Sequence, residues 1–165
     1  MTNQADSQLA AIGRLDALFE SNGIDYWLFG GWAVDLHAGR VTRDHEDVDI
    51  AVWQTDRGSV RALLVADGWT DTTPAESDGY ESYSSDELRL DVAFLARDRH
   101  GIVYTPLRGG RGEWPMDSFA ADVRDLAGVR AHVVTRASLI ADKSELREDA
   151  ATAGKDAADA RVLRS

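Results

Sequence analysis

The stretch GGWAVDLHAGRVTRDHEDVDIAVW, residues 30–53, decides how this chain is expected to fold. The apolar aromatic run before it, residues 25–29, is typical of a buried strand, and the glycine pair Gly30-Gly31 predicts a sharp turn. Residues 32–38 then predict a short helix that Gly39 ends. The order is therefore strand, glycine turn and helix.

Residues 47–53 alternate between polar and apolar side chains, which is typical of a strand with one buried face. The alternation places Asp47 and Asp49 on the same face. Asp91 occupies a similar face in the alternating segment 88–95. If these two strands are neighbours, three carboxylates converge on one sheet face beside the glycine turn.

Such a cluster of carboxylates has a chemical use. Carboxylates a few ångströms apart repel one another, and a cation relieves the repulsion. Mg²⁺ prefers hard oxygen ligands, usually one or two carboxylates together with substrate phosphates. A glycine turn that opens a helix suits phosphate, because backbone N–H groups can approach it without a side chain in the way. Since two metal ions held by aspartates can clamp an in-line displacement, the pattern indicates phosphoryl or nucleotidyl transfer from a triphosphate.

The rest of the chain predicts a sheet extended by antiparallel strands and closed by helices. The spacing of apolar residues predicts helices over residues 9–19, 57–67, 138–150 and 155–163, with Gly154 separating the last two. Further strands are expected at residues 69–72, 80–83, 88–95, 102–104 and 129–134. Residues 105–119, rich in glycine, arginine and proline, predict a loop.

Length and composition narrow the possible functions. With 165 residues the chain is expected to form one domain, residues 1–165, with a catalytic sheet core over 1–104 and the loop, last strand and C-terminal helices over 105–165. A net charge of −11 disfavours nucleic acid as a partner and favours a cationic small molecule. There are no cysteines, which excludes disulfides and thiol chemistry. Without a leader-like or membrane-spanning apolar run, we expect a soluble cytoplasmic protein with no membrane partner.

The segment 30–53 resembles the signature of the aminoglycoside and lincosamide nucleotidyltransferases, small members of the polymerase-beta-like nucleotidyltransferase superfamily. It is similar to that family's glycine pair, Trp-Ala-x-Asp helix, Thr-Arg-x-His segment and Asp-x-Asp strand, in the same order. LRLDVAFL, GEWP and ADKSELREDAATAGKDAADARVL continue the resemblance toward the C-terminus. The resemblance implies an α/β (α+β) nucleotidyltransferase fold, with a mixed sheet, flanking helices and C-terminal helices.

The resemblance also implies a metal site. Asp47 and Asp49 would ligate Mg²⁺, and Asp91 would ligate a metal, deprotonate the acceptor hydroxyl, or do both. Gly30 and Gly31 would hold the triphosphate.

Other residues near the signature are expected to support this site. Lys143 would contact a phosphate. Arg43 and His45 would either touch phosphate or steady the strand by hydrogen bonds to Asp47. Asp35 would orient the glycine turn.

The function that the resemblance implies is transfer of AMP, or another NMP, from ATP or another nucleoside triphosphate to an antibiotic hydroxyl. An aminoglycoside is favoured as acceptor, because an acidic chain attracts a polycation. The alternative acceptors are a lincosamide and, for a toxin-type enzyme, a protein or RNA. A further alternative is a nucleotide-binding module without catalytic activity. The oligomeric state, monomer or homodimer, stays open.

Overall fold

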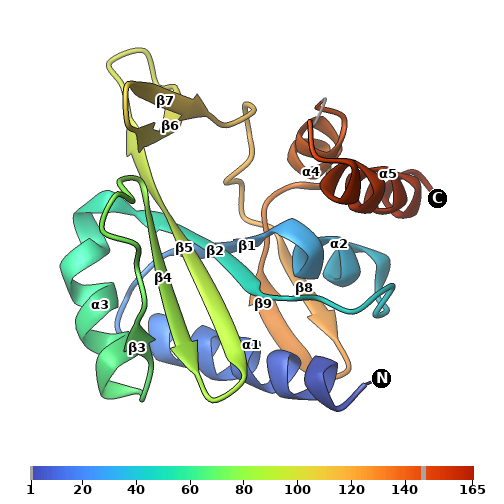
Figure 1. The fold of residues 1–165 in the computed structure, drawn as a ribbon, viewed down its shortest axis with the longest axis horizontal. Helices are drawn as coiled ribbons and strands as arrows, with labels where there is room; N and C mark the ends of the chain where they lie inside the picture. Colours follow the sequence, from blue (N-terminus) through green and yellow to red (C-terminus); the bar gives the residue numbers. More distant parts are fainter. Residues whose placement is uncertain (1, 146–147) are drawn as a thin grey trace.

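The computed structural model describes residues 2–145 and 148–165, which fold around a mixed sheet with helices packed on it (Figure 1). In the described residues this sheet has seven strands: β1-β2-β5-β4-β3 in order, with β6 pairing with β5 and β7 pairing with β6. β8 and β9 form a separate hairpin. The strands are β1 (Tyr26–Phe29), β2 (Val48–Trp53), β3 (Thr70–Asp71), β4 (Tyr80–Ser85), β5 (Leu88–Arg97), β6 (Val103–Leu107), β7 (Gly110–Glu113), β8 (Val123–Leu126) and β9 (Val129–His132).

The helices form where the apolar spacing predicts them, with changes at their ends. They are α1 (Asn3–Ser21), α2 (Gly30–Ala38), α3 (Arg57–Ala66), α4 (Arg136–Lys143) and α5 (Ala150–Arg164), with a short 3₁₀ turn, η1 (Gln54–Asp56), before α3. α4 and α5 pack against each other and against α2 (Figure 1).

The predicted boundary between the two C-terminal helices is wrong. The helix expected over 138–150 ends at Lys143, and residues 146 and 147 of that range lie outside the described residues. α5 starts earlier than expected because the Asp149 side chain accepts a hydrogen bond from Thr152 N, as an N-cap does. Gly154 therefore lies inside α5 and does not separate two helices.

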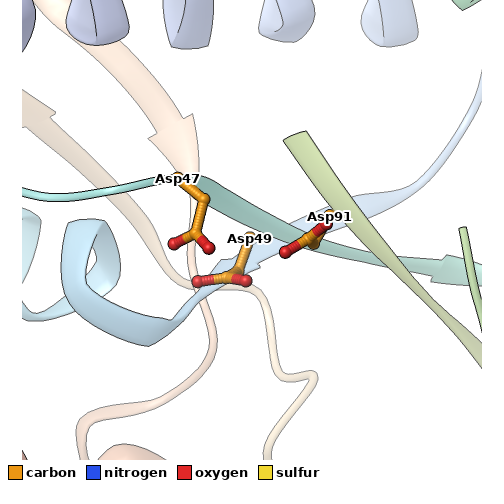
Figure 2. A group of neighbouring side chains, drawn as sticks. All are labelled: Asp47, Asp49 and Asp91. Carbon is orange, nitrogen blue, oxygen red and sulfur yellow. The ribbon is translucent and has the colours of Figure 1, made fainter. Parts of the chain in front are cut away.

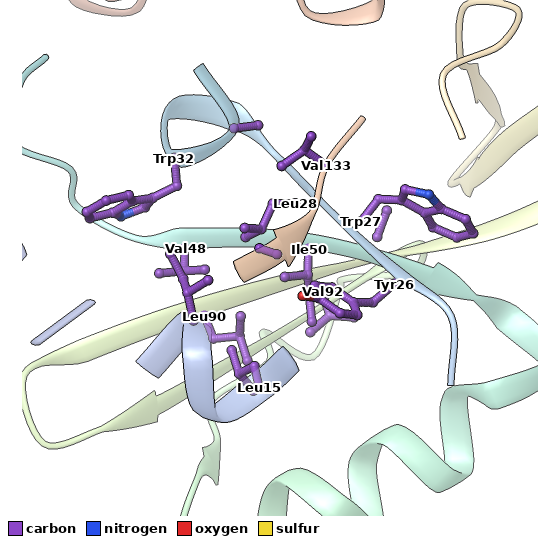
Figure 3. Close-up of a cluster of buried hydrophobic side chains, with 14 of the residues drawn as sticks. Leu15, Tyr26, Trp27, Leu28, Trp32, Val48, Ile50, Leu90, Val92 and Val133 are labelled. Carbon is purple, nitrogen blue, oxygen red and sulfur yellow. The ribbon is translucent and has the colours of Figure 1, made fainter. Parts of the chain in front are cut away.

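The core lies between the sheet and α1. β2 pairs with β5 in parallel, and the alternating apolar residues of both strands are fully buried. Figure 3 shows Leu15 of α1 beside Val48, Leu90 and Val92, with Trp27 and Trp32 toward the edges of the cluster. Because this face is committed to the core, the polar residues that alternate with it must lie on the other face.

Residues 105–119 are not a simple loop, which corrects the sequence-based expectation. β6 continues to Leu107 and turns through Arg108 and Gly109 into β7, with Gly109 at φ 79°. Main-chain hydrogen bonds hold this hairpin, so it forms although its side chains show no apolar alternation. The boundary expected after residue 104, between the catalytic sheet core and the C-terminal part, therefore falls within β6.

β8 was also not expected from the sequence. It pairs with β9, the predicted last strand, through a two-residue turn in which Ala127 and Gly128 have φ of 51° and 81°. Two positive φ values in a row match the turns that suit the twist of a hairpin. After β9, Val134 N donates to Leu28 O, so the hairpin is attached to the β1 edge of the sheet.

Candidate active site

The three predicted aspartates meet at one end of the parallel strand pair. Asp49 of β2 is the register partner of Asp91 on β5, and Asp47 comes directly before β2. One carboxylate oxygen from each lies within 4.8 Å of the others, and all three side chains are partly buried. Figure 2 shows the carboxylates grouped at this point. We call Asp47, Asp49 and Asp91 the carboxylate triad.

The glycine turn lies directly against the triad. β1 is antiparallel to β2 and pairs Phe29 with Asp49, so the chain enters the turn beside that carboxylate. Gly30 has φ +66°, and a Cβ there would overlap Asp49 Oδ2. α2 begins at this residue. The turn therefore needs glycine both for its left-handed backbone and for the space that Asp49 occupies.

The side chains of His45 and Arg43 leave no room for a Cβ at Gly31. A Cβ on Gly31 would lie 2.6 Å from His45 Cε1 and 2.8 Å from Arg43 Nη2, closer than non-bonded atoms approach. With a bare backbone at both glycines, the N–H groups at the start of α2 stay accessible to an anion beside the triad.

The triad is electrostatically unfavourable by itself. Burial raises the pKa of Asp49 well above its usual range, and the charges of Asp47 and Asp91 raise it further. The pKa of Asp47 is raised as well, by burial first and then by Asp91. A proton or a cation relieves this repulsion. Three partly buried carboxylates match the hard oxygen ligands that Mg²⁺ prefers.

Ser82 orients one member of the triad and was not predicted from the sequence. Its Oγ donates to Asp91 Oδ1 over 2.7 Å, because Ser82 on β4 is the register partner of Asp91. Only the strand register reveals this pairing, and β4 residues carry no motif. Asp91 thus has one oxygen engaged by Ser82.

Arg43 and Lys143, both predicted phosphate contacts, come together close to the glycine turn. Arg43 Nε and Nη2 donate to Asp159 Oδ1 and Oδ2, each over 3.0 Å. Lys143 Nζ lies 3.0 Å from Asp156 Oδ1 and 3.2 Å from Asp159 Oδ2. We call these four residues the α5 ion-pair cluster, since both carboxylates come from α5. Neither Asp156 nor Asp159 was expected at the site, because nothing local in the sequence connects them to residue 43.

His45 and Asp35 form a buried support beneath the turn. His45 Nε2 lies 2.6 Å from Asp35 Oδ2, and Thr42 N donates to Asp35 Oδ1 over 3.1 Å. Asp35 is 0% exposed. The expected hydrogen bonds from residues 43 and 45 to Asp47 are not the ones formed: His45 bonds to Asp35, and the residue 43 guanidinium bonds to α5. Asp35 therefore fixes the position of the imidazole that packs under the glycine turn.

A cavity of ≈ 340 Å³ opens next to the turn. Gly30 and Tyr80 line it on the triad side, and Trp114 lines it from the end of β7. The Trp114 indole N–H donates to Thr105 Oγ1 over 3.0 Å, so the ring is anchored in the wall. Three further carboxylates line the cavity, those of Glu113, Asp142 and Glu145.

The site and the topology define a class of protein. A strand, a glycine turn and a helix present backbone N–H groups beside aspartates on the neighbouring strand, which is the arrangement of a nucleotidyltransferase fold. ANT(2'')-Ia in complex with adenylyl-2''-tobramycin has a TM-score of 0.74 at 22% identity, with 95% of this chain and 87% of that chain covered. The lincomycin-bound lincosamide antibiotic adenylyltransferase LnuA has a TM-score of 0.70 at 22% identity, with 92% and 93% covered. The expected fold class, α+β with a mixed sheet, is confirmed.

The chain belongs to the aminoglycoside-2''-adenylyltransferase family, whose model matches residues 11–152. The 2''-aminoglycoside nucleotidyltransferase of Klebsiella pneumoniae is 27% identical over 100 residues, or 61% of this chain. That match spans 56% of the relative's length, about half of it. The family indicated by the resemblance is therefore confirmed. Within the described residues, none of the helices is long and apolar enough to cross a membrane.

Proposed function

We propose that this protein is a Mg²⁺-dependent nucleotidyltransferase that transfers AMP, or another NMP, from ATP or another nucleoside triphosphate to a hydroxyl of an aminoglycoside antibiotic. The observation that carries the proposal is the grouping of Asp47, Asp49 and Asp91 within 4.8 Å, directly against the Gly30 turn. Membership of the aminoglycoside-2''-adenylyltransferase family supports the same reaction. Inactivation of the drug would confer resistance.

Each residue has a part in this proposal. Asp47 and Asp49 would hold Mg²⁺, and Asp91 would ligate the metal and accept the proton of the acceptor hydroxyl. A metal held there would supply positive charge to offset the negative charge that develops on the attacking and leaving oxygens. The backbone at Gly30 and Gly31 receives the triphosphate at the start of α2, where the N–H groups are unpaired within the helix.

Two positively charged side chains lie near the proposed position of the triphosphate. Arg43 and Lys143 bring positive charge to the glycine turn, where the charge of the triphosphate would accumulate. Their long side chains come from different parts of the chain and reach the same place. Both are proposed as phosphate contacts.

The acceptor is proposed to occupy the cavity beside the triad. Glu113, Asp142 and Glu145 line it, and carboxylates in a cavity attract the ammonium groups of a polycationic sugar. Trp114 offers a flat apolar wall for a sugar ring. The chain's net charge of −11 adds a long-range attraction for such a substrate.

A lincosamide is the second candidate acceptor. Phe29, Leu107 and Leu139 give part of the cavity an apolar lining, which suits a drug with fewer charges. The likeness to the lincomycin-bound LnuA fits this alternative but does not favour it over an aminoglycoside.

Magnesium-dependent pyrophosphate release tests the proposal. ATP, GTP, CTP and UTP are each incubated with panels of aminoglycosides and lincosamides, and the product mass identifies the modified drug. Asp49→Asn should abolish release, whereas the matched control Glu46→Gln should retain it. Glu46 precedes the triad but points to solvent and pairs with Lys155 over 2.6 Å. Nucleotide binding without release for any drug would refute the proposal and leave a protein or RNA acceptor to be sought.

We further propose that residues 1–165 act as one nucleotidyltransferase domain and that the protein works in the cytoplasm, where nucleoside triphosphates are abundant. The acidic surface fits a substrate that is a cation and does not fit a nucleic acid. Light scattering with and without drug would distinguish a monomer from a homodimer.

A further inference from the structure

One carboxylate of α5 joins two cations that come from distant parts of the chain. Asp159 binds the Arg43 guanidinium through both oxygens, and its Oδ2 also lies 3.2 Å from Lys143 Nζ. The residue is 1% exposed. Burial alone would raise the pKa of Asp159, but the hydrogen bond from Arg43 and the charge of Lys143 outweigh it and hold the pKa below its usual range.

The cations that Asp159 binds are next to the glycine turn. Arg43 Nη2 would lie 2.8 Å from a Cβ on Gly31. The Lys143 ammonium is close enough to Asp49 to oppose the rise in that residue's pKa. The α5 ion-pair cluster therefore borders the glycine pair and lies near the triad, where the triphosphate is proposed to bind.

Two cations at one place repel each other, and both side chains are long and flexible. A shared carboxylate offsets the repulsion and limits each side chain to one geometry. Of the five guanidinium N–H groups of Arg43, the described contacts use three, two toward Asp159 and one toward the Asp44 carbonyl. The remaining N–H groups leave Arg43 able to bind an anion while it stays on Asp159.

On the basis of the function proposed above, we propose that Asp159 is a positioning residue for the nucleoside triphosphate: it holds Arg43 and Lys143 together at the start of α2, where both meet the phosphates. The C-terminal helix α5 thus completes the nucleotide site, although Asp159 itself touches no substrate. Without this carboxylate Lys143 keeps Asp156 as a partner, but Arg43 loses both of its hydrogen bonds to α5, so the triphosphate binds more weakly.

Direct binding of MgATP in the absence of drug tests the proposal, so that the acceptor does not enter the result. Isothermal titration should show that Asp159→Asn raises the Kd for ATP roughly tenfold, the effect of losing one charged hydrogen-bonding partner. Asp159→Glu keeps the charge on a longer arm and should give an intermediate Kd. It also serves as the test variant if Asp159→Asn does not fold.

A matched control separates positioning from stability. Asp16→Asn removes another buried carboxylate, which accepts a 2.6 Å hydrogen bond from Tyr26 Oη and lies outside the site. It should lower the melting temperature and leave the Kd for ATP unchanged. In an Arg43→Gln background the effect of Asp159→Asn on the Kd should become clearly smaller, because Asp159 acts through Arg43.

The outcomes distinguish this proposal from the proposed function. If Asp159→Asn and Asp159→Glu bind ATP as tightly as the wild type, or more tightly, the positioning role is refuted even where drug transfer is observed. If the wild type binds ATP and the variants weaken binding while no drug is modified, the positioning role stands and the drug-transfer proposal fails. If the wild type does not bind MgATP, the titration is repeated with MgGTP, MgCTP and MgUTP, and a wild type that binds none of the four refutes both proposals.

Discussion

The carboxylate triad and the α5 ion-pair cluster both border the Gly30-Gly31 turn, but their charges are arranged in opposite ways. The triad gathers three like charges, and the pKa values of Asp47 and Asp49 rise. The cluster alternates its charges, and the pKa of Asp159 falls while that of Lys143 rises. Burial acts against the charged form in both places, so the neighbours decide the sign of each shift.

This difference shows which of the two regions neutralises its buried charges with its own residues. The cluster pairs its buried charges with its own residues, so the removal of one partner would leave a buried charge uncompensated and destabilise the fold. The triad keeps a repulsion that its own residues do not remove, so it lowers the stability of the folded chain in exchange for affinity for a cation. Substitutions in the triad and in the α5 ion-pair cluster should therefore change activity and stability in different proportions.

The largest effect is expected from neutralising the triad. Asp49→Asn should lower kcat/KM for drug modification by about 10³-fold, since it removes a proposed metal ligand at the reacting centre. In metal-free buffer at pH 7 the same change should raise the melting temperature, because asparagine has no ionisable group that must be buried beside Asp47 and Asp91. Steady-state kinetics and thermal unfolding measure the two effects. A variant that is less active and also less stable without metal would contradict the account of stored repulsion.

Gly30→Ala should have the next largest effect. The new methyl overlaps Asp49 Oδ2, and the left-handed φ of +66° is strained for alanine. We expect kcat/KM to fall by about 10²-fold, in line with the loss from a small displacement at a reacting centre. Gly58→Ala in α3 is the matched control, since its Cβ would meet no atom within 4 Å and its activity should be unchanged. Equal activity of both variants would show that the turn does not need glycine.

Ser82→Ala should give a smaller loss that is confined to turnover. The change removes the 2.7 Å hydrogen bond that orients Asp91 and leaves the carboxylate in place. A decrease in kcat of about tenfold, with little change in the KM for ATP, is expected from the loss of one charged hydrogen bond. Ser84→Ala on the same strand, paired with Arg89 and not with the triad, is the control.

The smallest expected effect is a dependence of stability on pH that belongs to the cluster. Because folding lowers the pKa of Asp159, the folded state binds fewer protons at this residue, and stability should rise with pH. The stabilisation is complete above the unfolded value of about 3.9 and is lost as the pH falls through the lower folded value. Urea unfolding should therefore show wild type and Asp159→Asn differing at pH 5 to 7 and converging in acid. A difference that grows in acid would reverse the assigned sign.

Much of the fold and the triad could be predicted because local pattern decides them. The run before Gly30, the glycine pair and the alternation over 47–53 define strand, turn, helix and strand without distant information. The two-residue alternation of side chains along a strand places Asp49 and Asp91 on the polar faces of their strands. Only their adjacency required an assumption, namely that the two strands are neighbours.

The remaining features depend on contacts that no local pattern encodes. The β6–β7 hairpin is held by main-chain pairing, so its glycine-rich and arginine-rich composition resembles that of a loop. Ser82 acquires its role only from the register of β4 with β5. Asp159 meets Arg43 across most of the chain length, and an Asp on an exposed-looking helix pattern gives no sign of burial. These are the residues for which the structure was needed.

The parallel pairing of β2 with β5 also determines when the site comes into existence during folding. A parallel neighbour is reached only after a long excursion, here through α3, β3 and β4, and the entropy of closing that loop is lost before the contact forms. Asp49 and Asp91 therefore meet only when this loop closes and β5 pairs with β2. A chain still emerging from the ribosome has no triad until β5 has been synthesised, and because the same β2–β5 pairing buries Val48, Ile50, Leu90 and Val92, the triad and this part of the core form together.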